Sequence, residues 1–216
     1  MQAWGTHTYE DYRPVNRFPT RSGLLGLLGA CLGIDRQDRE ALEQLAQSVT
    51  LTVRVDRQVV RPGEEALQPR NALKAVDFHT VLAARKVDGS VNPNPVVSRR
   101  EYLYDAAFTV AVGEQTAAAY ALEQLVEAVR RPVYTPVLGR RSCPLARPLL
   151  EGTGVIEATD ALAALQQIPP GTGLLYAEGT EHANGRPLAI RDVPLHGVHR
   201  QFGTRWVSVH AGQQEG

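Results

Sequence analysis

Two adjacent arginines in a proline-rich stretch have the chemistry to hold phosphate groups. Residues 130–148, RRPVYTPVLGRRSCPLARP, contain five arginines, four prolines and no acid. Proline fixes φ near −65° and lacks an amide donor, so we expect an extended, stiff loop rather than a helix. A guanidinium group can grip phosphate oxygens bidentately. Arg140 and Arg141 are therefore the first candidates for an anion site, and the alternative is a solvated basic loop without a ligand.

The other charged residues are grouped rather than spread evenly. The net charge at pH 7 is zero, because 23 Lys and Arg balance 23 Asp and Glu. Residues 12–34 hold three arginines and no acid, whereas residues 149–184 hold five acids and no Lys or Arg. Zero net charge argues against unselective binding of polyanions. Separate basic and acidic segments still allow local binding of nucleic acid and protein neighbours elsewhere.

The sequence offers no pattern typical of a metal site, a redox site or a membrane segment. Cys31 and Cys143 lack the close spacing of metal ligands, and neither HxxxH nor CxxC occurs, so we expect no metal and no cofactor. The longest apolar run, residues 23–33, has half the length needed to cross a bilayer. No cleavable signal is visible. We therefore expect a cytoplasmic protein that does not contact the membrane.

A glycine-rich apolar segment is the first predicted helix. Ser22 is the expected N-cap, and the leucines of GLLGLLGACLGI supply the apolar face. The glycines recur every three or four residues, so we expect them to share one side and admit a close neighbour. No strand precedes them, and neither GxGxxG nor GKS/T is present, which excludes Rossmann and P-loop sites. We expect the N-terminus of this helix to face an anion.

Alternating patterns predict two strands with an arm between them. Residues 48–56 alternate as a half-buried strand does, and residues 102–112 are expected to form one continuous strand. Tyr102 could stack a base there, although an aromatic residue on a sheet more often belongs to the core. Residues 83–100 have basic flanks around turn formers such as Asp88-Gly89, so they predict a projecting hairpin. The alternative is a segment that is disordered when unbound.

The remaining patterns complete a mixed α+β chain. Helices are expected at residues 38–47, 116–130 and 160–167, and short strands near residues 173–176, 187–191 and 205–210. Strands alternating with helices of these lengths predict an α+β fold of ferredoxin-like type. We assign residues 1–150, including the arm, to this domain. Residues 151–216 are assigned to a small C-terminal β-rich region.

Three sequence blocks resemble one family. MQAWG with FPTRSGLLGLLGACLGI, DFHTVLAAR with RREYLYDAAFTVAV, and YTPVLGRRSCPL closely resemble the CasD (Cas-five) family of type I-E CRISPR Cascade complexes. IRDVP and HRQF extend the resemblance nearly to the C-terminus. The resemblance implies an RRM-like fold of the repeat-associated mysterious protein (RAMP) class, with the arm as a thumb. It also implies an apolar strand ahead of MQAWG, so we expect the sheet to lack its first strand.

The resemblance implies a binding role in an antiviral ribonucleoprotein. Such subunits hold the 5′ handle of the CRISPR RNA (crRNA), cap a backbone of Cas-seven subunits and contact the large subunit (CasA, Cse-one). Contact with target DNA is then indirect. The RNA-binding residues that we expect on this basis are Thr20, Arg21, Ser22, His79, Arg85, Lys86, Arg99, Arg100, Tyr102, Arg140, Arg141 and Ser142.

An endoribonuclease is the alternative, because Cas-five proteins of type I-C systems cut CRISPR RNA without a metal. Such cleavage needs a base, an acid and a cation for the phosphorane. His79, Tyr102 or Tyr104, and Lys74 are the candidates for these roles. The sequence does not cluster its histidines, and type I-E systems use a separate ribonuclease. We therefore expect a non-catalytic subunit without catalytic residues.

Overall fold

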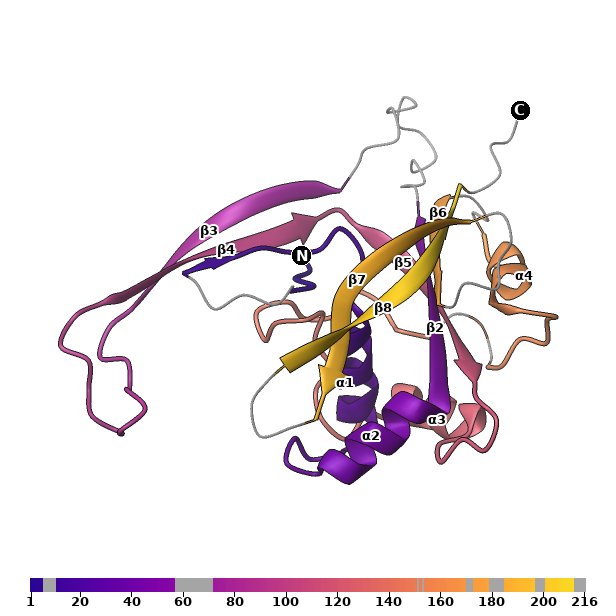
Figure 1. Ribbon diagram of the computed structural model, residues 1–216, viewed down its shortest axis with the longest axis horizontal. Helices are drawn as coiled ribbons and strands as arrows, with labels where there is room; N and C mark the ends of the chain where they lie inside the picture. The colour runs from indigo at the N-terminus through magenta and orange to yellow at the C-terminus, as the bar shows by residue number, and fades with distance from the viewer. Residues whose placement is uncertain are drawn as a thin grey trace.

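The chain folds into a body with a projecting arm. The computed structural model describes residues 1–5, 11–56, 72–150, 152, 154–169, 173–178, 185–196 and 201–211. In these ranges it forms a five-stranded sheet with helices in the body and a three-stranded sheet in the arm (Figure 1). The predicted mixed α+β class is confirmed. The turn-rich segment 57–71 lies outside the described residues.

The larger sheet combines strands from both halves of the sequence. Its strand order is β5-β2-β6-β8-β7, with every neighbouring pair antiparallel. Because β6 pairs with β2, the sheet crosses the division that we predicted at residue 150. Strand β5 forms one edge of the described sheet, and the expectation that the sheet lacks its first strand stays a prediction. The strands are β2 Val49–Asp56, β5 Ala107–Glu114, β6 Gly173–Glu178, β7 Arg186–Leu195 and β8 Gln201–His210.

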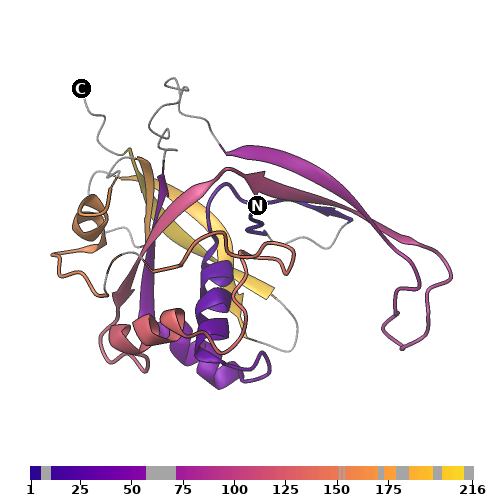
Figure 2. The same cartoon turned by 180° about the vertical axis from the view of Figure 1, so that it is seen from behind.

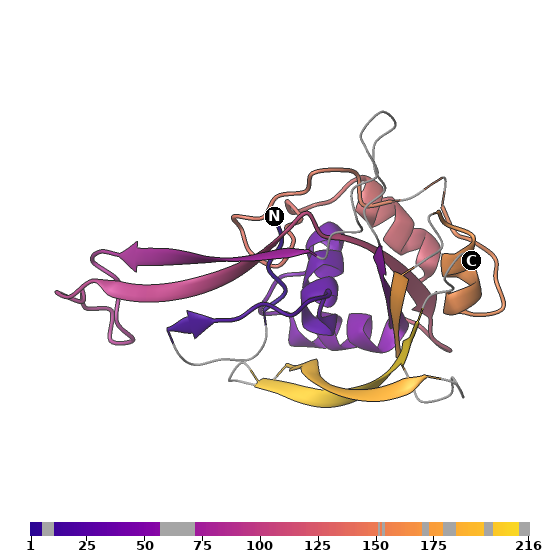
Figure 3. The same cartoon turned by 90° about the horizontal axis from the view of Figure 1, so that it is seen from above.

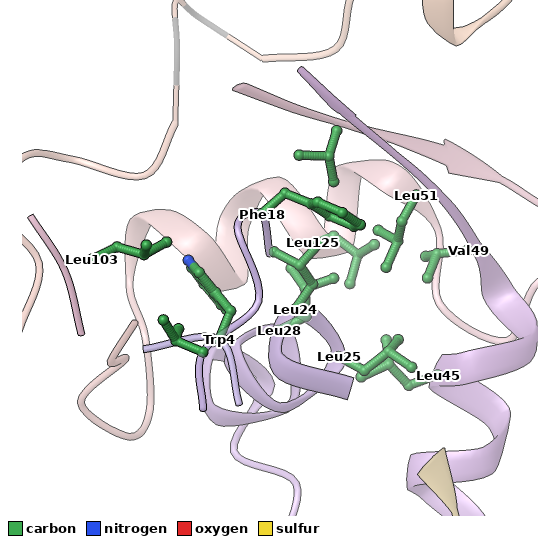
Figure 4. Packing of buried hydrophobic residues seen from close by; sticks show 12 residues of the cluster. Trp4, Phe18, Leu24, Leu25, Leu28, Leu45, Val49, Leu51, Leu103 and Leu125 are labelled. Carbon is green, nitrogen blue, oxygen red and sulfur yellow. The ribbon is translucent and has the colours of Figure 1, made fainter. Parts of the chain in front are cut away.

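Helices cover both faces of this sheet in the described part of the chain. Helix α1 contacts α2, α3 and β7, and it lies between α3 and the β7–β8 hairpin (Figure 3). Helix α4 packs on the other face, against β2, β5 and β6. Leucines of α1 and the apolar residues of β2 form the main core with Trp4 and Phe18 (Figure 4). The helices are α1 Arg21–Leu32, α2 Arg39–Ser48, α3 Leu122–Arg130 and α4 Ala161–Gln166.

Helix α1 begins two residues earlier than predicted, because its N-cap is Thr20 and not Ser22. The Thr20 side chain accepts a hydrogen bond from Gly23 N at 3.3 Å. The glycines do not share one contact surface either. A Cβ on Gly23 would lie 2.8 Å from the Trp4 ring, whereas Gly26 has no neighbour within 4 Å. Gly33 ends the helix at φ 77°, a left-handed conformation that glycine adopts without strain.

Strand β2 is buried on both faces and not on one as predicted. Val49, Leu51 and Val53 face the core that α1 contributes to. Thr52 and Arg54, on the opposite face, are also buried because α4 lies over that side. The alternating pattern identified the strand, but Thr52 and Arg54 do not face solvent.

The continuous strand predicted at residues 102–112 is wrong. Strand β4, Val96–Tyr104, ends in the arm, and β5 begins at Ala107 in the body. Asp105 between them has φ 52°, a left-handed conformation that Asp tolerates better than most residues. The predicted helix 116–130 is also shorter, because Ala117 has φ 60° and α3 begins only at Leu122.

The arm is a long hairpin with a third strand beside it. Strand β3, Leu73–Val81, pairs with β4 over its whole length, and β1, Tyr12–Arg13, runs parallel to the other edge of β4. Strands β3 and β4 extend beyond the body (Figure 1). The predicted hairpin is thus confirmed, although its paired strands reach further toward the body than residues 83–100. Its assignment as a thumb stays a prediction.

Candidate nucleic-acid interface

The loop that carries Arg140 and Arg141 is a tight turn docked beside the arm. Leu138 N donates to Cys143 O at 2.8 Å, which closes the turn over residues 139–142. Ala3 N donates to Leu138 O at 3.0 Å and joins this turn to the N-terminal segment. Gly139 has φ 87°, and a Cβ there would lie 2.0 Å from Ala3 O, so the position requires glycine. Figure 2 shows residues 131–150 running past the N-terminus to the base of the arm.

A small buried cluster holds the turn against β4. Ala3, Tyr102 and Cys143 pack together and are almost fully buried. Burial raises the pKa of the Cys143 thiol, which favours its neutral form. The Tyr102 hydroxyl lies 3.4 Å from Ser142 Oγ. In this structure the Tyr102 ring belongs to the core, which is the alternative that we gave to base stacking.

The two arginines of the pair occupy different environments. The Arg140 guanidinium donates to Glu101 O at 3.0 Å and to Arg13 O at 3.3 Å. Its Cζ also lies 4.8 Å from the centroid of the Tyr102 ring, within the range of a cation–π contact. Arg141 is exposed, and the described residues give its side chain no hydrogen bond or ion pair. Arg140 therefore fixes the turn, and Arg141 is the one that presents a guanidinium to solvent.

Strand pairing decides which arm residues share a face with this turn. Directly paired residues of neighbouring strands point to the same face, and alternate residues of one strand do too. Arg100 pairs with Asp77 of β3 and with Arg13 of β1. Because Arg100 and Tyr102 are two residues apart, this row lies on the face that the turn covers. His79, two residues after Asp77, continues the face outward.

We call the group Arg13, His79, Arg100, Arg141 and Ser142 the basic face. It brings together four of the predicted residues and one, Arg13, that the sequence reasoning missed. The signal for Arg13 was its place in the acid-free segment 12–34, but only the pairing of β1 with β4 sets it beside Arg100.

Short polar contacts hold two side chains of the basic face, Arg100 and His79, in place. Arg100 Nε donates to Ser98 Oγ at 3.0 Å. His79 Nε2 lies 2.5 Å from Asp77 Oδ2, so the acid on this face already has a partner. This arrangement leaves the guanidinium groups of the face to meet an external anion.

The remaining predicted arm residues lie away from the basic face. Arg99 occupies the opposite face of β4, since neighbouring residues of a strand alternate. Arg85 and Lys86 are both exposed near the tip of the arm, where Arg85 bridges to Val91 and Lys86 N donates to Ser90 O at 2.8 Å. The contact of these three residues with RNA stays a prediction.

The start of α1 is used within the fold. Arg21 Nη1 lies 2.6 Å from Glu178 Oε2, and Arg21 Nη2 donates to Ala46 O at 2.6 Å. Arg21 N donates to Asp192 Oδ2 at 2.7 Å. The anion that we expected at this helix N-terminus is thus the protein's own carboxylate. RNA contacts by Thr20, Arg21 and Ser22 stay predictions, but Thr20 is buried and the Arg21 guanidinium is occupied.

The residues nominated for RNA cleavage are not brought together. Lys74 lies on the opposite face of β3 from His79 and pairs with the buried Glu101 at 2.7 Å. Tyr102 is buried beneath Arg140. The position of Tyr104 is six strand residues from that of His79, about 20 Å. The arrangement therefore does not form an acid–base set from these groups.

Neither a metal-binding cluster nor a membrane-spanning helix is found among the described residues. No group of three or more His, Cys, Asp or Glu side chains among them is placed to hold a metal ion. None of the described helices has both the length and the apolar character to cross a membrane.

Comparison with known proteins places the chain in a family. The model of the CRISPR-associated protein Cas5 family matches residues 1–208. The CRISPR system Cascade subunit CasD of Escherichia coli K12 is 43% identical over 214 residues, which are 98% of this chain and 92% of the relative. A solved CRISPR RNA-guided surveillance complex contains a similar chain, with TM-score 0.71, 27% identity and coverage of 98% of this chain and 86% of the other. A crystal structure of a Cas protein matches with TM-score 0.64, 27% identity and coverage of 97% and 89%. This chain therefore belongs to the Cas5 family of CRISPR-associated proteins, in the type I-E group that includes CasD.

Proposed function

We propose that this chain is a non-catalytic crRNA-binding subunit of a type I-E Cascade complex. It holds the 5′ handle of the crRNA on an RRM-like RAMP fold and caps the Cas-seven backbone next to the large subunit (CasA, Cse-one). It acts in the cytoplasm in antiviral defence, with target DNA bound indirectly. Its similarity to CasD and to a chain of an RNA-guided surveillance complex supports this assignment.

The observation that carries the proposal is the convergence of cations on the basic face. Arg13 precedes Arg100 by about 90 residues, and Arg100 precedes Arg141 by about 40, by their numbering. Strand pairing and the docked turn set the three residues on one side of the arm. Single-stranded RNA offers a row of phosphates, and arginine binds phosphate bidentately. Because the protein has no net charge, a local cationic surface of this kind suits binding of a short RNA segment and not unselective binding of polyanions.

The endoribonuclease alternative has no comparable support. It would need His79, a tyrosine and Lys74 around one phosphate, and these side chains occupy different faces or distant rows of the arm. The function that the geometry supports best is therefore binding.

Replacement of Arg141 tests the proposal. Removing one cation that neutralises a phosphate of single-stranded RNA should reduce the log–log slope of affinity against salt by about 0.7. We expect Arg141→Ala to bind the repeat RNA of its own CRISPR locus more weakly and with a slope reduced by about this amount. The measurement is fluorescence anisotropy with labelled RNA over a salt series.

The matched control is Arg131→Ala, which removes another exposed arginine. Its side chain is 86% exposed and pairs with Glu127 of α3, away from the basic face. We expect the slope of this variant to equal that of the wild type. An unchanged slope for Arg141→Ala would show that the turn does not hold RNA.

A further inference from the structure

The face of the arm opposite the basic face carries two exposed aromatic side chains beside an arginine. Arg99 of β4 pairs with Tyr12 of β1 on one side and with Phe78 of β3 on the other. The three residues thus form one row across all three strands, and their side chains share a face. Tyr12 is 42% exposed and Phe78 61% exposed, so both rings present surface to solvent.

A hydrogen bond to a buried carboxylate fixes the position of the Tyr12 ring. Its hydroxyl donates to Glu101 Oε1, and Glu101 Oε2 accepts from Val15 N at 2.8 Å and from Lys74 Nζ at 2.7 Å. Glu101 is only 4% exposed, so this anchor lies within the arm. The hydrogen bond to Glu101 is also the main reason why the pKa of Tyr12 is raised. A ring that is already oriented loses little conformational freedom when a ligand stacks on it.

The row lines a hollow in the surface. Residues of this row form a cavity of about 700 Å³ together with Asp11, Val97 and Ser98. The side chain of Arg99 is exposed, and the described residues give it no hydrogen bond or ion pair. The outer two strands lie two inter-strand spacings apart, about 10 Å. Arg99 lies on the strand between the two rings, so a base that stacks on this row has a cation within reach of its phosphate.

We propose that this row is a second RNA contact, which takes one unpaired nucleotide of single-stranded RNA. The base stacks against Phe78 and Tyr12, and Arg99 binds the adjoining phosphate. Stacking on aromatic side chains next to a cation is the usual way in which proteins hold unpaired bases. The inference rests on the proposed RNA-binding function and adds a surface on the other side of the arm.

RNA fits this row better than a protein segment does. The row joins an unpaired guanidinium to two separate rings, which matches the alternation of phosphate and base along RNA. An apolar protein segment would leave the Arg99 charge covered and unpaired, at a cost in free energy. A result in which the row supports binding of a protein partner and not of RNA would therefore overturn the proposal.

The test uses the full chain and the repeat RNA carrying 2-aminopurine at one position at a time. Stacking on an aromatic ring quenches the fluorescence of this base analogue, so we expect one position to be quenched by the wild type and not by Phe78→Leu. Phe78→Leu should weaken binding about 5- to 150-fold, the effect of removing one base stack, without changing the salt slope. Arg99→Gln should reduce the slope by about 0.7. Tyr12→Phe should retain the quenching, because the ring remains.

The control is Trp206→Leu, which removes an exposed aromatic side chain from the five-stranded sheet and should bind as the wild type does. The inference is overturned if no position is quenched in a Phe78-dependent way, or if Phe78→Leu impairs assembly with partner subunits while RNA affinity stays within twofold. If only this inference fails, Arg141→Ala will still reduce the slope of log affinity against log salt. If the wild type does not bind the RNA, both proposals fail.

Discussion

The adjacent residues Arg140 and Arg141 should respond to alanine substitution in opposite ways. Arg140 uses its guanidinium inside the protein, where it donates to two backbone carbonyls and lies over the Tyr102 ring. Arg141 extends into solvent. We therefore expect Arg140→Ala to reduce stability and Arg141→Ala to reduce RNA affinity while leaving stability nearly unchanged.

The size of the effect at Arg140 follows from its contacts. Hydrogen bonds from a charged donor contribute about 1.5–3 kcal/mol each, so two near the lower limit give about 3 kcal/mol. The contact with Tyr102 adds about 0.5–1 kcal/mol. Alanine avoids the entropy cost of ordering a long side chain, about 1–2 kcal/mol. The expected loss is about 2 kcal/mol, which corresponds to a decrease in Tm of about 4–8 °C for a chain of this size.

Urea unfolding of the two variants and the wild type measures this difference. Arg141→Ala is the matched control, because an exposed side chain without partners changes stability by about 0.5 kcal/mol or less. Arg140→Lys should fall between alanine and the wild type, since it keeps the charge but cannot bridge two carbonyls and a ring. Equal unfolding midpoints for the two alanine variants would refute the assignment of Arg140 to the support of the turn.

Two further predictions concern buried ionic groups. Arg54 is fully buried, with Nε 2.6 Å from Asp56 Oδ1 and Nη1 2.8 Å from Ile168 O. Arg54→Met should therefore lower the free energy of unfolding by about 3–5 kcal/mol. Urea unfolding, with the exposed Arg36→Met as the control, measures this loss, and a value below about 1 kcal/mol would contradict the prediction. Burial acts to raise the pKa of Glu101, but hydrogen bonds from Lys74 and other donors outweigh it and lower the pKa below its usual 4.5. The resulting stability is present above pH 4.5 and is lost as pH falls through the lower folded pKa. Glu101→Gln should therefore lose less stability than the wild type on acidification, and parallel stability curves from pH 6 down to about pH 3 would contradict this reasoning.

Local patterns were sufficient to find most elements of the fold. The alternation of Val49, Leu51 and Val53 predicted β2, and the turn formers around Asp88 predicted the hairpin, since both signals depend on neighbours in sequence. The prediction failed where one residue changed the chain direction. At Asp105 a left-handed backbone separates β4 from β5, and the apolar alternation on both sides continues as though the strand were unbroken.

The candidate RNA surface divides in the same way. The sequence by itself determined where cations are concentrated and which segments cannot be helical, because composition and proline act locally. Once the strand is assigned, the sequence also places Arg99 and Arg100 on opposite faces of the arm, because neighbouring residues of a strand alternate.

Only the tertiary structure decided which cations remain available. Arg21 meets Glu178, an acid from a segment that has no base of its own, across 157 residues of sequence, and Arg140 donates to the carbonyls of Glu101 and Arg13. A guanidinium takes whichever acceptors the fold brings within about 3 Å. That proximity depends on strand pairing and loop closure between distant segments, and no local pattern specifies it.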